Sequence, residues 1–186
     1  MNVNEGDATF SNVPSSLGSL IPSSTGFETS YTLPSVISAG AAYDLTRELT
    51  LCLDVNYTTW NSFDQLDYTF NDYSNLNFTS IKNYENAFAI RLGAQYEISE
   101  RIAARGGIAF DSSPVQDQYI SPENPDNNRF MVSLGGTIKF GENFSVDVAY
   151  MLQNIKERES MNEQYHFEGT YKSLNNIFGV TLNYEF

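Results

Sequence analysis

The sequence predicts an all-β fold, an antiparallel up-and-down β-barrel that crosses a membrane. Three observations support this prediction. Apolar side chains recur at every second position over segments of about ten residues, aromatic residues stand at the ends of these rows, and the breaks between the rows alternate between short and long. In a transmembrane barrel strand, apolar residues that face lipid alternate with residues that face the interior.

Seven segments carry this alternation. The first is rich in small residues and the others are more apolar; they cover 35–43, 49–57, 88–98, 102–110, 130–140, 144–152 and 178–186. The residues at the row centres are expected to face lipid: Leu51, Leu92, Ile108, Leu134, Val148 and Leu182. Aromatic rings at both ends of a row fit the two interfaces between a bilayer and water. A water-soluble β-sandwich has no such interfaces.

The breaks between the rows predict the topology. Short and long breaks alternate: 44–48, 61–83, 99–101, 112–128, 141–143 and 154–169. Outer-membrane barrels have short periplasmic turns and long extracellular loops. If the C-terminus lies in the periplasm, counting strands back from it places every short break in the periplasm as well. The seven rows are then seven transmembrane strands within residues 34–186.

The N-terminal residues predict a piece of a larger barrel. Residues 1–10 have the character of the end of a further, upstream strand, and 11–33 follow as an extracellular loop. The start has no basic region, apolar region or cleavage site of a secretory signal. We therefore expect residues 1–186 to form a single C-terminal portion of a barrel, with seven to eight strands.

Composition excludes several classes of function. A formal net charge of -13 argues against nucleic acid, whose binding surfaces are basic. One Cys and one His, Cys52 and His166, cannot form a disulfide or a thiolate and imidazole zinc cage. We expect no metal and no cofactor. No run of 18 apolar residues occurs, so no transmembrane helix is predicted.

The C-terminus carries a phased apolar row that ends at the last residue. Its members are Phe178, Val180, Leu182, Tyr184 and Phe186. An aromatic residue that closes such a row resembles the signal by which the outer-membrane assembly machinery recognises its substrates. We expect the barrel assembly machinery and outer-membrane lipid to be partners, and the cell outer membrane to be the location.

Several stretches resemble one family, the FadL-type long-chain fatty acid and hydrocarbon transporters of the outer membrane. They are GDATFSNVP followed by LPSVISAGAAYDL, then VNYTTWNSFDQL, GIAFDSSPV, DNNRFMVSLGGTIKF and FGVTLNYEF. The resemblance implies a barrel of fourteen strands, of which this chain supplies the C-terminal half, with the plug and the kinked early strand upstream. It also implies passive uptake of long-chain fatty acids or similar hydrophobic compounds, without enzymatic activity.

The segment from Val13 to Leu33 is more apolar than a loop in water requires. Its candidate ligand-binding residues are Val13, Leu17, Leu20, Ile21 and Phe27. An exposed apolar patch of this kind is typical of a binding groove for an amphipathic ligand. The resemblance supports this interpretation, because extracellular loops form the initial binding groove in that family. The alternative is that these residues pack into the barrel mouth.

Charged residues on the interior-facing rows have two interpretations. They are Asp54, Arg91, Glu97, Arg105, Arg129, Lys139 and Asp147. They can line a polar pathway, but such side chains more often pair across neighbouring strands. The mid-strand pairs Gly106–Gly107 and Gly135–Gly136 likewise indicate either coiling of the sheet or a kink that admits substrate.

Two further segments offer weaker signals. His166 lies near Glu163 and Glu168, which permits acid/base chemistry, but no serine follows it two residues on as in the outer-membrane phospholipases. The run 121–128, SPENPDNN, offers oxygen ligands for calcium without the EF-hand ladder. The main alternative to transport is a structural or adhesive barrel. A barrel that carries a hydrolase activity is the third class of function considered.

Overall fold

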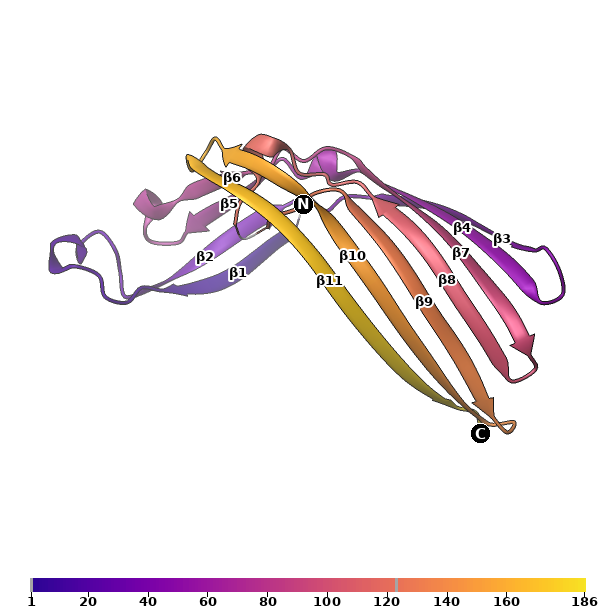
Figure 1. Ribbon diagram of the computed structural model, residues 1–186. Helices are drawn as coiled ribbons and strands as arrows, with labels where there is room; N and C mark the ends of the chain where they lie inside the picture. The colour runs from indigo at the N-terminus through magenta and orange to yellow at the C-terminus, as the bar shows by residue number, and fades with distance from the viewer. Residues whose placement is uncertain (1, 123) are drawn as a thin grey trace. The chain divides into compact units, whose positions relative to one another are not determined.

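The computed structural model describes residues 2–122 and 124–186 (Figure 1). Regular structure in these ranges consists of β-strands and short 3-10 turns of three residues. The chain divides into two units, one made of residues 1–35 and 59–85 and the other of 36–58 and 86–186. None of the helical turns in the described ranges is long and apolar enough to cross a membrane.

The second unit is a seven-stranded antiparallel sheet in the order β11-β10-β9-β8-β7-β4-β3, drawn as the long strands of Figure 1. Its strands are β3 (Val36–Asp44), β4 (Leu49–Thr58), β7 (Ala87–Ser99), β8 (Ile102–Asp111), β9 (Arg129–Phe140), β10 (Phe144–Asn162) and β11 (Phe167–Tyr184). Each strand pairs with the next one of the unit along the chain. The seven strands predicted between residues 34 and 186 are all present, and the sheet is open, with β3 and β11 at its edges.

The register of this sheet separates its side chains into an apolar face and a polar face. Leu92 on β7 lies opposite Ile108 on β8, which lies opposite Val132 on β9. On the other face Asp54 of β4 lies opposite Arg91. The six row-centre residues predicted to face lipid are all exposed, with exposed fractions between 41% and 68%. Such a broad exposed apolar surface is what a lipid-facing wall requires.

Two mid-strand glycines lie where neighbouring strands come close. A Cβ on Gly107 would lie 3.0 Å from the backbone oxygen of Leu92, and one on Gly135 would lie 3.0 Å from that of Val148. Because these two glycines have no side chain, the backbone of the neighbouring strand can come close to them. This favours coiling of the sheet over a substrate-admitting kink as the reason for these glycines.

The first unit is a four-stranded antiparallel sheet in the order β1-β2-β5-β6. Its strands are β1 (Asn2–Thr9), β2 (Ser24–Tyr31), β5 (Gln65–Phe70) and β6 (Phe78–Ile81), with 3-10 turns η1 (Ser15–Leu17), η2 (Trp60–Ser62) and η3 (Ser74–Leu76). The predicted extracellular loop 11–33 and the predicted long break 61–83 thus contain strands of their own. Residues 2–9 do form a strand, and its described partner is β2.

The prediction of a long break over residues 154–169 is wrong. Strand β10 continues to Asn162 and β11 begins at Phe167, so the two strands form one long hairpin closed by residues 163–166. The apolar row ends at Leu152, but backbone pairing continues beyond it, with one register shift between Ile155 and Arg158. Alternation of apolar residues is expected only where a strand contacts lipid. The backbone hydrogen bonds that pair two strands do not depend on this alternation, so pairing can continue beyond the apolar row.

Candidate functional site

The apolar residues predicted to bind ligand fall in two places within the first unit. Three of them form a compact turn around η1: the backbone N–H groups of Leu20 and Ile21 both donate to the Leu17 carbonyl, at 2.9 and 3.0 Å. Leu17 and Leu20 are 40% and 53% exposed, whereas Val13 and Ile21 are half-buried. We call residues 13–21 the apolar turn. The structure therefore brings Leu17, Leu20 and Ile21 together on the surface.

Phe27 does not belong to this turn. It lies on β2, directly opposite Phe70 of β5, with ring centroids 5.7 Å apart. A row of ring contacts continues from there to Tyr68 and Phe78 on one side and to Phe10 on the other, and we call it the aromatic row. Phe10 also donates its backbone N–H to Ser23, at the base of the apolar turn.

Most of the aromatic row escaped prediction. The alternation Leu66, Tyr68, Phe70 within β5 is the sequence signal that identifies it, but the segment is too short to stand out from a loop. A second group of rings in the same unit, Trp60, Phe63 and Tyr84, is joined by edge-to-face contacts of 5.3 to 6.2 Å. The first unit is thus held together largely by aromatic side chains.

The polar face of the seven-stranded sheet carries one hydrogen-bonded network near its shorter hairpin turns. Arg105 on β8 donates to Gln95 Oε1 at 2.6 Å and to Thr137 Oγ1 at 2.7 Å, and it pairs with Asp147 at 3.3 Å. Thr137 donates a short hydrogen bond to Asp147, which also accepts one from Asn183. The network links five strands, from β7 to β11, which fits the structural interpretation of these charges.

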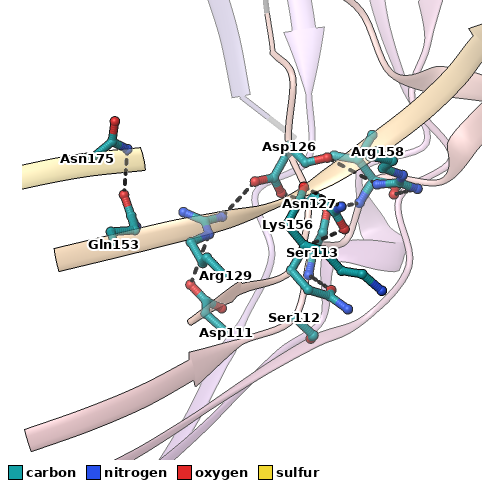
Figure 2. Close-up of polar contacts among 12 residues, drawn as sticks. Asp111, Ser112, Ser113, Asp126, Asn127, Arg129, Gln153, Lys156, Arg158 and Asn175 are labelled. Atoms are coloured by element: carbon teal, nitrogen blue, oxygen red, sulfur yellow. Dashed lines mark hydrogen bonds and ion pairs between the residues drawn. The ribbon is translucent and has the colours of Figure 1, made fainter. Parts of the chain in front are cut away.

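A second network lies at the other end of the same strands (Figure 2). Arg129 at the start of β9 stands between two carboxylates: its Nη2 donates to Asp126 at 2.9 Å, and its Nε lies 3.7 Å from Asp111. That Nε–Asp111 distance is too long for a hydrogen bond, and the buried Nε has no other partner. Arg129 is therefore held by electrostatic attraction on both sides.

Arg158 anchors the segment 112–128 to the extended part of β10. Its guanidinium contacts Asp117 at 2.5 Å and donates to the backbone oxygens of Val115 and Asp126 at 2.8 and 3.1 Å. Asn162 donates to the carbonyl of Ile120, which is only 1% exposed. The segment predicted as a long extracellular loop is thus held against β10, with η4 (Asp117–Tyr119) at the contact.

The remaining interior charges do not all pair. Among the described residues, Asp54, Arg91 and Lys139 form no ion pair, and Glu97 accepts a hydrogen bond from Gln95. Between Arg91 and Arg105 the polar face is hollowed by a groove of about 480 Å³. The two interpretations of these charges therefore apply to different residues: Arg105, Arg129 and Asp147 are structural, whereas Arg91 faces an open groove.

The two weaker sequence signals lie in different surroundings. His166 occupies the turn between β10 and β11 with a positive φ of 52°. In the run 121–128, Asp126 is bound by Arg129 and Ser113, and Glu123 lies outside the described residues. No group of three His, Cys, Asp or Glu side chains in the described ranges is placed to hold a metal ion.

The C-terminal row occupies one face of β11, at the edge of the sheet. Phe178, Val180, Leu182 and Tyr184 are 60% to 77% exposed, and Phe186 follows the strand end. Phe178 packs its ring against Tyr150 of β10 at 4.9 Å. The row is therefore an accessible apolar edge; its recognition by an assembly machinery stays a prediction.

Comparison with known proteins places this architecture in a family. Residues 4–186 match the family described as outer membrane protein transport protein (OMPP1/FadL/TodX). The chain belongs to this family. The long-chain fatty acid transport protein of Escherichia coli is 38% identical over 133 residues, which cover 70% of this chain and 28% of that protein. Outer membrane protein P1 of Haemophilus influenzae is 30% identical, covering 83% and 36%.

A solved structure shares the fold. A FadL homologue of Pseudomonas aeruginosa superposes with a TM-score of 0.80 at 22% identity, over 88% of this chain and 38% of that one. The chain thus spans about a third of the relatives that it matches. With the family shown, the seven-stranded sheet is part of an outer-membrane β-barrel of the OMPP1/FadL/TodX type. That its apolar face is the lipid-facing wall stays a prediction.

Proposed function

We propose that this chain is part of a passive outer-membrane channel for long-chain fatty acids or similar hydrophobic compounds, and that the protein is a transporter without enzymatic activity. Family membership supports transport. The name of the E. coli relative, a long-chain fatty acid transport protein, supports the compound class. In this proposal apolar contacts bind the cargo, and no covalent step occurs.

The observation that carries the proposal is the apolar turn. Leu17 and Leu20 expose apolar side chains on a turn whose backbone is already fixed by its own hydrogen bonds. Asn75, the middle residue of η3, donates to the Leu20 carbonyl at 3.1 Å and holds the turn further. A rigid apolar surface loses little conformational entropy when a hydrophobic compound covers it. We therefore infer that the turn captures cargo on the extracellular side.

The test is a double replacement, Leu17→Ser with Leu20→Ser, in the protein purified from outer membranes. The turn's hydrogen bonds are made by backbone atoms, so the fold is expected to persist. Full burial of such a side chain stabilises by about 1.5 to 3 kcal/mol, and these residues are already partly covered. We expect oleate to bind about tenfold more weakly or worse, measured by equilibrium binding, with a matching loss of uptake by cells.

Leu33→Ser is the matched control, because Leu33 is 59% exposed in the same unit but lies outside the apolar turn. It is expected to leave oleate binding unchanged. Heat-modifiable electrophoretic mobility confirms that each variant assembles. Unchanged oleate binding in the assembled double variant would contradict capture by the turn, and would favour the structural or adhesive alternative.

We also propose that the row ending at Phe186 is read by the barrel assembly machinery. Its exposed position on the edge strand supports this proposal. Deletion of Phe186 is expected to lower the amount of assembled barrel in outer-membrane fractions. Deletion of the loop residue His166 serves as a control for the loss of one residue elsewhere. Normal barrel levels without Phe186 would argue against the signal.

A further inference from the structure

The groove on the polar face of the seven-stranded sheet has a floor of small, uncharged residues. In the register of the sheet, Gly93 lies opposite Gly107, and Gly107 lies opposite Ser133. In the next cross-strand line Gly135 lies opposite Ala149. Because these residues have little or no side chain, they leave a trough of about 480 Å³ over the middle of β7 to β10. That volume lies in the range of small-molecule sites.

The lining of the trough is apolar and adaptable in its middle, and charged side chains line it as well: Asp54, Arg91, Arg105 and Asp147. Met131 on β9 and Met151 on β10 both line it, as does Cys52 on β4. Methionine side chains are unbranched and polarisable, so they fit apolar chains of differing shape. Ser133 is the polar side chain in the central line, and its hydroxyl is near the Gly107 carbonyl. The middle of the trough therefore suits an alkyl chain better than a charged group.

The two arginines that line the trough differ in their partners. Arg105 already binds Gln95, Thr137 and Asp147. Arg91 is exposed and forms no ion pair with any described carboxylate, although Asp54 lies directly opposite it in the register. Asp54 is turned toward β3 instead, where its carboxylate covers Gly40. The pairing that cross-strand neighbours of opposite charge ordinarily make is absent here.

One uncharged partner orients Arg91. With the Asn56 amide placed so that both of its ends are satisfied, its oxygen accepts from Arg91 Nη1 at 2.9 Å and its nitrogen donates to Ser38 at 3.0 Å. A single acceptor leaves most of the five guanidinium donors open. A guanidinium fixed at one nitrogen and open elsewhere matches the planar oxygens of a carboxylate.

We propose that Arg91 binds the carboxylate of an amphipathic cargo whose alkyl chain lies in the trough between Met131 and Met151. This inference rests on the proposed transport function and narrows it: the channel selects hydrophobic compounds with an anionic head over neutral hydrocarbons. Arg91 is then a specificity-determining residue, and the glycine floor provides the space for the chain.

The experiment compares two probes of equal chain length, oleate and oleyl alcohol, by equilibrium binding to the protein purified in detergent. Arg91→Gln keeps a hydrogen-bonding side chain beside Asn56 and removes the charge. A hydrogen bond to a charged group is lost in this variant, so oleate is expected to bind roughly ten- to a hundredfold more weakly. Binding of oleyl alcohol is expected to stay the same.

Two further variants separate the inference from simpler explanations. Asp54→Asn is the matched control. If Arg91 serves only to neutralise the charge of Asp54, this variant weakens oleate binding as Arg91→Gln does. That result would overturn the proposal. We expect the variant to leave oleate binding unchanged or tighter, because a like charge is removed. Ala149→Leu fills the floor and is expected to weaken both probes alike.

The outcomes distinguish this inference from the transport function itself. Loss of oleate selectivity in Arg91→Gln alone supports the proposal. Equal binding of both probes by the unaltered protein and by Arg91→Gln overturns it while leaving transport of hydrophobic compounds in place. Failure of the unaltered, assembled protein to bind either probe would contradict the proposed function as well.

Discussion

The seven-stranded and four-stranded sheets divide their apolar and polar side chains in different ways. In the seven-stranded sheet the apolar face is aliphatic and exposed, and the polar face is joined by hydrogen bonds and ion pairs. In the four-stranded sheet the apolar side chains are rings that pack on one another, so that Phe70 is only 8% exposed. We expect lipid to cover the first kind of apolar face, whereas the rings of the second kind cover much of one another's surface.

The opposite face of the four-stranded sheet is acidic. Glu5 on β1 lies directly opposite Glu28 on β2, and Asp67 projects from β5 on the same face. Like charges directly opposed weaken a sheet, and we expect the packing of rings on the other face to offset this cost. We therefore expect the larger sheet to depend on its bilayer for stability, and the smaller one to depend on ring packing.

Phe70→Ala is expected to have the largest effect. Truncation of a buried phenylalanine costs about 3 to 5 kcal/mol, and the Phe70 ring contacts both Phe10 and Phe27. Amide hydrogen exchange in β2 and β5 is expected to accelerate by about a hundredfold or more, while exchange in β8 and β9 stays unchanged. Phe78→Ala is the control, since Phe78 is 49% exposed at the sheet edge, and a smaller change is expected. Equal effects of the two variants would contradict the dependence on ring packing.

Val148→Arg tests the lipid-facing wall of the larger sheet. An arginine on the lipid face near the bilayer midplane costs about 2 to 4 kcal/mol. The neighbouring variant Ala149→Arg places the same side chain on the polar face of the same strand, where it is expected to cost far less. Denaturant unfolding in lipid vesicles measures both free energies. Equal tolerance at the two positions would show that the faces are assigned wrongly.

Thr79→Val addresses the acidic face and has the smallest expected effect. The Thr79 hydroxyl donates to Asp67 at 2.6 Å and, with a second hydrogen bond from Gln65, holds the pKa of Asp67 below its ordinary value. A lowered pKa stabilises the fold above the pKa of the unfolded chain, and that contribution is lost as the pH falls through the folded pKa. The variant is expected to raise the pKa of Asp67, followed by carboxyl NMR titration. Thr69→Val, on the same face but without a bond to Asp67, is expected to leave it unchanged.

The sequence by itself determined the larger sheet. The rows centred on Leu51, Leu92 and Leu134 alternate every second residue, and strand geometry then fixes which face each side chain occupies. The bilayer imposes this alternation on each strand separately, so a local pattern suffices to find strands and faces. The same reasoning located the exposed C-terminal row, whereas Leu17 and Leu20 were identified because their loop is unusually apolar. The roles of both remain predictions.

Only the tertiary structure decided what the long breaks contain and which charges stay open. Strands β2 and β5 pair across about forty residues of chain, and Arg158 reaches segment 112–128 through contacts with no sequence period. That Asp54 turns toward Gly40, and that Arg91 has no ion pair among the described residues, depends on the side chains of three adjacent strands. Alternation in the sequence indicates which face of the sheet a residue occupies. It does not indicate which neighbour the residue contacts there, because pairing across strands joins residues that are distant in the chain.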